Sequence, residues 1–197
     1  MLDSLLVESI ALTVLLLLLI FWLLLRVKVR RQSPDHRIQK ILKPYQQDDA
    51  RQLIIPDGMG GLLEIEHLVL LRQGLLILHR YPLNGHLFGA EKIDQWTQLV
   101  DGRSYKFANP LMHLMHVQQS LALLAPKIPV FTHVVFTGQC NFPKGKPDNA
   151  SVLNTLEADL EAVFKQPAVA ESPLHKAWQT VLNVARHNGK SAAEAFK

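Results

Sequence analysis

The stretch LLEIEHLVLLRQGLLILHRY, residues 62–81, contains two apolar runs on either side of Gln73-Gly74. The first run alternates in part between apolar residues and the carboxylates Glu64 and Glu66, whereas the second begins with four consecutive aliphatic residues. Two such runs around a glycine turn are typical of an antiparallel β-hairpin. We therefore expect a hairpin over residues 62–81, with its strands inside a larger sheet.

Further elements are predicted on both sides of this hairpin. Before it, the sequence favours a short helix at residues 36–43, a polar loop at 46–51 and a strand at 53–55. After it, we expect short strands at 86–88 and 96–99, a helix opened by Asn109-Pro110, a strand at 129–137, and helices at 151–165 and 174–188. His133 falls in the apolar strand and is expected to be a core residue. This order predicts a single α/β domain with a mixed sheet and flanking helices.

The N-terminal segment is far more apolar than the rest of the chain. Residues 9–25 carry no charge, and extension back to Leu5 gives a run of 21 residues. At a rise of about 1.5 Å per residue this run matches a hydrocarbon core of about 30 Å. The acidic start and the absence of a small-residue cleavage site disfavour a signal peptide. The sequence thus predicts a single transmembrane helix over residues 5–25.

The charges around this run predict its orientation. The basic stretch RVKVRR at residues 26–31 follows it, whereas Asp3 and Glu8 precede it. The positive-inside rule places the basic flank in the cytoplasm. We expect a short extracytoplasmic N-terminus (1–4), a basic juxtamembrane linker (26–37) and a cytoplasmic C-terminal domain at an inner or plasma membrane.

Charge and cysteine content exclude two classes of protein. Of the net charge of +4, residues 38–197 contribute only +2, from 16 Lys and Arg against 14 Asp and Glu. The domain therefore lacks the strong basic footprint of a duplex DNA-binding protein. One cysteine, Cys140, excludes a scaffold held by internal disulfides and fits a reducing compartment.

Several residues around the hairpin match the pattern of a known family. The matching positions are Ile65-Glu66-His67, Gly74, His79-Arg80-Tyr81, Gly85, Trp96, Asn109-Pro110 and His113. In order and spacing they resemble the nuclease-related NERD domain, a branch of the PD-(D/E)XK restriction-endonuclease-like fold. The resemblance implies a NERD-like domain at 38–165 followed by a C-terminal helical extension at 166–197. It also implies an ancestral role in DNA metabolism or processing.

The residues that carry the family's chemistry are replaced. In the family an Asp and a Glu hold a divalent metal, usually Mg²⁺, and a Lys two positions after the Glu steadies the attacking hydroxide. Here the Asp position is Glu66, the Glu position is His79, the Lys position is Tyr81, and a Gln on the following helix is His113. We therefore expect a catalytically degenerate pseudonuclease with no cofactor, which binds nucleic acid or a protein partner.

Three interpretations of these positions remain open. In the simplest, the site has decayed, Glu66 is solvated or paired with a base such as Arg80, and His79 and Tyr81 are packed or hydrogen-bonded. In the second, Glu66, His79 and His113 form a metal site, since one carboxylate and two imidazoles suit Zn²⁺, Mn²⁺ or Fe²⁺. The third is a residual nuclease with an altered mechanism. The second and third make the protein a metal-dependent nuclease with a remodelled site.

Overall fold

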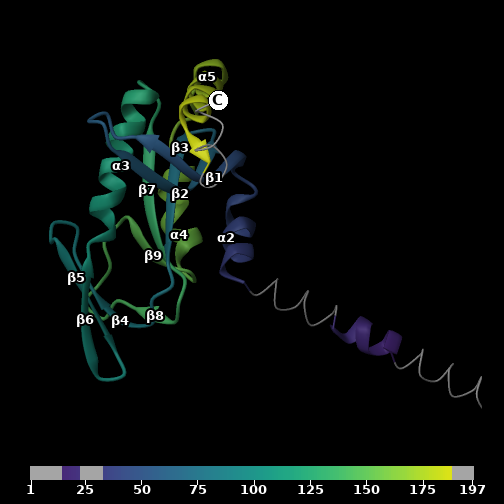
Figure 1. The fold of residues 1–197 in the computed structure, drawn as a ribbon, viewed down its shortest axis with the longest axis vertical. Helices are drawn as coiled ribbons and strands as arrows, with labels where there is room; N and C mark the ends of the chain where they lie inside the picture. Colours follow the sequence, from purple (N-terminus) through teal and green to yellow (C-terminus); the bar gives the residue numbers. More distant parts are fainter. Residues whose placement is uncertain (1–14, 23–32, 188–197) are drawn as a thin grey trace, which may run out of the picture. The chain divides into compact units, whose positions relative to one another are not determined.

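The computed structural model describes residues 15–22 and 33–187, and the chain divides into two compact units, residues 1–40 and 41–197. The second unit holds a six-stranded mixed sheet with the order β10-β1-β2-β3-β7-β9 (Figure 1). Its strands are β1 (Gln46–Pro56), β2 (Leu62–Leu71), β3 (Gly74–Tyr81), β7 (Val130–Phe136), β9 (Ala150–Val152) and β10 (Arg186–His187). The predicted hairpin is confirmed as β2 and β3, which occupy the centre of this sheet.

A second sheet of four strands has the order β6-β5-β4-β8. Its strands are β4 (Gly85–Phe88), β5 (Gln95–Val100), β6 (Arg103–Ala108) and β8 (Cys140–Asn141). The inner face of this sheet is apolar: Trp96 is fully buried and its ring centroid lies 6.0 Å from that of Phe136 on β7. The expected mixed sheet is thus two sheets that share one core.

The sequence predicted a transmembrane helix over residues 5–25 as part of the fold, and this prediction is wrong. No helix among the described residues is long and apolar enough to cross a membrane. Within that range the structure describes residues 15–22, which are helical. Residues 1–14 and 23–32, which hold the expected N-terminus and most of the expected linker, lie outside the described residues. The fold class is therefore a mixed α/β domain.

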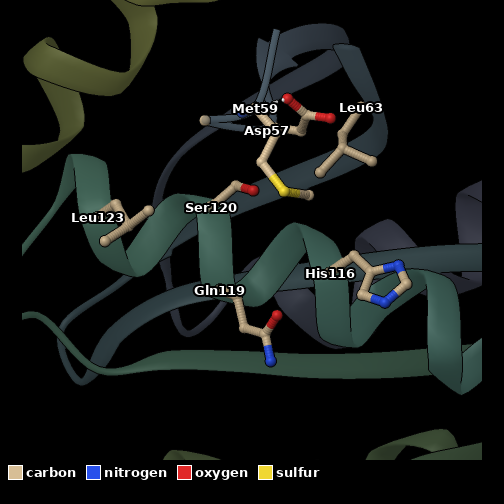
Figure 2. A pocket seen from close by; sticks show the side chains of 8 residues that line it. Asp57, Met59, Leu63, His116, Gln119, Ser120 and Leu123 are labelled. Carbon is tan, nitrogen blue, oxygen red and sulfur yellow. Dashed lines mark hydrogen bonds between the residues drawn. The ribbon is translucent and has the colours of Figure 1, made fainter. Parts of the chain in front are cut away.

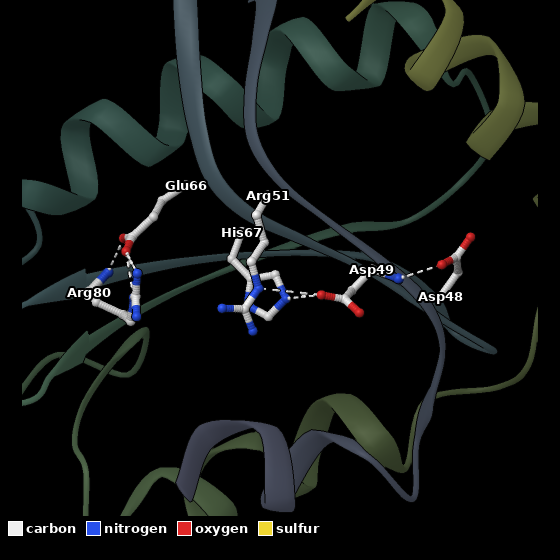
Figure 3. A network of polar contacts seen from close by, with 6 residues as sticks. All are labelled: Asp48, Asp49, Arg51, Glu66, His67 and Arg80. Atoms are coloured by element: carbon white, nitrogen blue, oxygen red, sulfur yellow. Dashed lines mark hydrogen bonds and ion pairs between the residues drawn. The ribbon is translucent and has the colours of Figure 1, made fainter. Parts of the chain in front are cut away.

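Helices cover both faces of the six-stranded sheet. These helices are α3 (Pro110–Leu124), α4 (Leu156–Phe164) and α5 (Glu171–Val184), whereas most of α2 (Pro34–Leu42) belongs to the first unit. Leu114 of α3 and Trp178 of α5 share one core cluster with Ile77 of β3. Leu156 and Leu160 of α4 are fully buried outside that cluster, and Figure 3 shows α4 on the opposite side of the strands from α3. The Asn109 side chain caps α3 by accepting from Leu111 N, as the sequence predicts.

Two polar segments that were not predicted as strands are strands. The polar stretch at residues 46–51 was expected to be a loop, but it pairs with β2 from Gln46 opposite Leu71 to Arg51 opposite His67. The strand β6 follows a turn in which Asp101 and Gly102 both have positive φ, 51° and 71°. Its side chains are mostly exposed, so no apolar periodicity marks it. In both cases backbone pairing with a neighbouring strand overrides a polar sequence.

The expected core position of His133 is confirmed, and its polar atoms are satisfied by a buried network. The ring is 2% exposed, and its Nε2 lies 2.6 Å from Ser151 Oγ. Ser151 donates to Asp159, which also accepts from Thr155 and pairs with Lys146 Nζ at 2.9 Å. Burial lowers the pKa of His133 to about 4. Burial alone raises the pKa of Asp159, but hydrogen bonds from Ser151, Thr155 and Lys146 outweigh it and lower that pKa. The network therefore joins β7, β9 and α4 around a neutral imidazole.

This network predicts a loss of stability on mild acidification. The pKa of His133 is near 6.5 in the unfolded chain and about 4 in the folded protein. As the pH falls below 6.5, the unfolded state therefore binds a proton that the folded state does not bind, and this stabilises the unfolded state. Between pH 7 and pH 5 the free energy of unfolding should fall by roughly 2 kcal/mol through this group alone. Urea unfolding of the wild type and of His133→Gln, followed by tryptophan fluorescence, should show a steeper pH dependence in the wild type. The exposed His175→Gln is the matched control, and parallel curves for wild type and His133→Gln would refute the assignment.

Candidate functional site

The two central strands separate at the positions that the sequence singles out. The β2–β3 pairing runs from Leu71 opposite Gly74 to His67 opposite Leu78 and ends there. Beyond that point β2 continues against β1 alone, with Ile65 opposite Leu53, and β3 continues against β7 alone, to Tyr81 opposite Phe136. The backbone N–H groups of β3 beyond Leu78 therefore lack a β2 carbonyl and need another acceptor.

Glu66 supplies that acceptor. Its Oε2 accepts from the backbone N–H of Arg80 at 2.7 Å, and its Oε1 accepts from the Arg80 guanidinium in a close ion pair (Figure 3). The Glu66 side chain is 21% exposed. Burial raises the pKa of Glu66, and the Arg80 N–H acts in the opposite direction. Burial also lowers the pKa of Arg80, but a guanidinium next to a carboxylate keeps its charge. The predicted pairing of Glu66 with Arg80 is confirmed, and it engages both carboxylate oxygens.

The other three predicted positions gather beside Glu66. His79 Nδ1 lies 3.9 Å from Glu66 Oε2, and its ring centroid is 4.9 Å from that of Tyr81. The ring of His113, from α3, meets the His79 ring edge-on at a centroid distance of 5.8 Å. His113 Nε2 lies 3.3 Å from the Glu64 carbonyl oxygen, so this nitrogen carries the proton and donates it. The structure thus brings together all four positions that the family pattern selects.

Burial keeps two of these groups neutral near pH 7. It lowers the pKa of His79, with a further contribution from His113, and so disfavours the imidazolium. It raises the pKa of Tyr81, and the charge of Glu66 adds to this effect. Where the family has a carboxylate and an amine, this chain therefore presents an uncharged imidazole and an uncharged phenol. Among the four family positions Glu66 is the one carboxylate, and it is paired with Arg80.

These side chains do not form a ready metal site. Across residues 15–22 and 33–187 no group of three or more His, Cys, Asp or Glu residues is arranged to hold a metal ion. Both oxygens of Glu66 accept hydrogen bonds from Arg80, and His113 Nε2 donates to the Glu64 carbonyl, so these atoms already have partners within the protein. The predicted set of Glu66, His79 and His113 is close in space but is committed to contacts within the protein.

A second polar network, which was not predicted from the sequence, joins the side chains of β1 to those of β2. Asp49 Oδ2 lies 3.0 Å from Nε2 of the buried His67 and 3.5 Å from Arg51 Nε (Figure 3). Asp48 accepts from Trp178 Nε1 at 2.9 Å and so joins β1 to α5. Burial, followed by the charge of Arg51, lowers the pKa of His67 despite Asp49. The period-two placement of Asp49 and Arg51 before Leu53 was the available signal for this strand.

A pocket of about 360 Å³ lies elsewhere, between the β1–β2 turn and α3 (Figure 2). Its lining residues are Asp57, Gly58, Met59, Leu63, His116, Gln119, Ser120 and Leu123. The Asp57 carboxylate accepts from the backbone N–H groups of Met59 and Gly61 at 2.7 and 2.8 Å, and this closes the turn. None of the four predicted site positions lines this pocket, so it offers no substrate cavity at Glu66.

Comparisons with known proteins agree with the resemblance. The family model of the nuclease-related domain, NERD, matches residues 32–137, which is more than half of the chain. An uncharacterized protein of Bacillus anthracis is 23% identical over 86 residues, which cover 43% of this chain and 41% of that protein. The chain therefore spans about two fifths of the length of that relative. No solved structure matches this chain. Over residues 32–137 this chain belongs to the NERD, or nuclease-related domain, family, and its sheet-rich domain is consistent with a restriction-endonuclease-like fold.

Proposed function

We propose that this NERD-family chain is a pseudonuclease that binds nucleic acid without cleaving it. One observation carries the proposal: Arg80 holds both oxygens of Glu66, the only carboxylate at the four family positions. A guanidinium at this place supplies the positive charge that a divalent metal supplies in an active site. The Arg80 guanidinium therefore takes the place of the metal ion at Glu66. A site without that metal ion lacks the group that polarises a phosphodiester in an active nuclease.

The remaining positions support the same conclusion. Mg²⁺ prefers several hard oxygen ligands and is usually bound through carboxylates, whereas His79 and His113 present nitrogen. Tyr81 keeps its proton because burial and Glu66 raise its pKa, so it does not act as a base near neutral pH. Without an ammonium group at this position, no cation faces an attacking hydroxide.

Nucleic acid is favoured over a protein as the partner because the family is nuclease-related. The small positive charge of residues 38–197 favours modest, salt-sensitive affinity over tight duplex binding. Binding at physiological salt should therefore be weaker than that of dedicated DNA-binding domains.

A metal-dependent nuclease with a remodelled site is the second candidate. It is favoured by the approach of His79 Nδ1 to within 3.9 Å of Glu66 and by the contact between the His79 and His113 rings. A neutral His79 is also the form that ligates Zn²⁺ or Mn²⁺. This function requires Arg80 to leave Glu66 when the metal enters.

The two candidates differ in a cleavage assay. The full chain, incubated with plasmid and with single-stranded DNA in the presence of Mg²⁺, Mn²⁺ or Zn²⁺, should leave both substrates intact while retarding DNA in a gel. The matched control is Glu66→Ala, prepared identically. Cleavage by the wild type that disappears in Glu66→Ala would overturn the pseudonuclease and establish the second candidate.

Rebuilding the family's residues should restore metal binding. In the triple variant His79→Glu, Arg80→Ala and Tyr81→Lys, Glu66 loses the guanidinium and gains a second carboxylate and an ammonium beside it. Calorimetric titration with Mg²⁺ should give a measurable heat of binding for the triple variant and none for the wild type. The reason is that Mg²⁺ is bound through carboxylate oxygens, and the triple variant offers two carboxylates without a guanidinium, whereas the wild type offers one that is paired with Arg80.

The single variant Arg80→Ala serves as the control for loss of the ion pair alone. Equal Mg²⁺ affinity in the wild type and the triple variant would show that Arg80 does not block the site.

A further inference from the structure

The four-stranded sheet has one buried face and one outer face of different chemistry. Strand residues alternate between faces, and Leu87 and Trp96 on the inner face are fully buried. Phe88 and Thr97, their neighbours along β4 and β5, therefore point outward and are partly exposed. Phe88 is not among the residues packed against the main core cluster. An aromatic ring thus lies on the solvent side of this sheet.

The register places this ring in a row with a lysine. Phe88 lies opposite Thr97, and Thr97 lies opposite Lys106 on β6. With neighbouring strands about 4.8 Å apart, the row from Phe88 to Lys106 is about 10 Å long. At its other end, Lys144 Nζ from the loop after β8 lies 5.9 Å from the centroid of the Phe88 ring. The row therefore presents a cation, an aromatic ring, a hydroxyl and a second cation.

No carboxylate lies on the strands that carry this row. The sequences of the four strands, GHLF, QWTQLV, RSYKFA and CN, contain no Asp or Glu. Neither Lys106 nor Lys144 forms an ion pair with any described residue. The next row includes His86, whose Nδ1 lies 2.6 Å from Asn141 Oδ1. The two ammonium groups are thus available for an anionic partner.

This combination matches unstacked nucleic acid better than a duplex. In single strands the bases are free to stack on an aromatic ring, while lysines on either side contact the backbone phosphates. In a duplex the bases stack on each other, so they are not free to stack on an aromatic ring of a sheet. The domain also lacks the positive charge that duplex binding requires. The two lysines are complementary to the charge of a phosphate chain that crosses the ring.

We infer that the outer face of the β4–β5–β6–β8 sheet binds single-stranded nucleic acid, with a base stacked on Phe88 and phosphates at Lys106 and Lys144. This inference rests on the proposed function and assigns its binding surface. The surface belongs to a different sheet from Glu66 and contains none of the four family positions. Binding therefore does not require a working cleavage site.

The test uses the full chain and a fluorescein-labelled 20-nucleotide oligo-dT in an anisotropy titration, with a 20-base-pair duplex for comparison. Phe88→Ala should weaken oligo-dT binding about tenfold, the usual value of one stacked base, and Phe88→Tyr should restore it. Lys106→Glu and Lys144→Glu should each weaken binding and reduce its salt dependence by about one counterion. The matched controls are Tyr105→Ala, an exposed aromatic on the opposite face of β6, and Lys176→Glu on α5; both should change affinity less than about twofold.

The outcomes separate this inference from the proposed function. If the wild type binds oligo-dT and none of the three outer-face substitutions weakens it, the face is not the binding surface, although the proposed function stands. Tighter binding of duplex than of oligo-dT would also overturn the inference. If the wild type binds neither probe, the proposed function itself fails. Lys144 lies in an exposed loop, so Lys144→Glu tests the face even if Phe88→Ala does not fold.

Discussion

The ion pair between Glu66 and Arg80 forms where the two central strands of the main sheet separate. Beyond His67 and Leu78 each strand keeps only its outer neighbour, and the Arg80 N–H has no strand partner on the β2 side. The Glu66 carboxylate satisfies that N–H and the guanidinium together. An uncompensated carboxylate at this half-buried place would be costly, so either a metal or a cation of the protein must face it. This chain uses Arg80, and the neutral state of His79 and Tyr81 follows from the same burial.

The hairpin, helix α3 and most strand positions were predictable because local signals and tertiary packing agree there: Gly74 fits the turn, and Asn109 caps the helix. The polar half of β1 was not predictable, since Asp48 and Asp49 are satisfied by Trp178 and His67, which are distant in sequence. Strand β6 was not predicted because its side chains are mostly exposed, and an exposed strand shows no alternation of apolar and polar residues. The apolar N-terminal run has the composition of a membrane helix, yet no helix among the described residues is long and apolar enough to cross a membrane.

The family spacing was sufficient to predict which side chains lie together at the candidate site. The family spacing selected Glu66, His79, Tyr81 and His113, and these side chains do lie together. Their proximity alone does not distinguish a metal site from a decayed one. That distinction depends on hydrogen bonds to backbone groups, at Arg80 N and Glu64 O, which no sequence pattern specifies. The binding surface that we propose on the second sheet contains none of these four positions.

The central claim is that Arg80 occupies the place of a divalent metal at Glu66. Paramagnetic broadening by Mn²⁺ in NMR spectra of the full chain, with labelled Glu and His side chains, tests it directly. Signals of Glu66, His79 and His113 should persist at Mn²⁺ concentrations that broaden only exposed carboxylates such as Glu157. Selective loss of those three signals at the lowest Mn²⁺ concentrations would show that a metal displaces Arg80, and the account given for this site would be wrong.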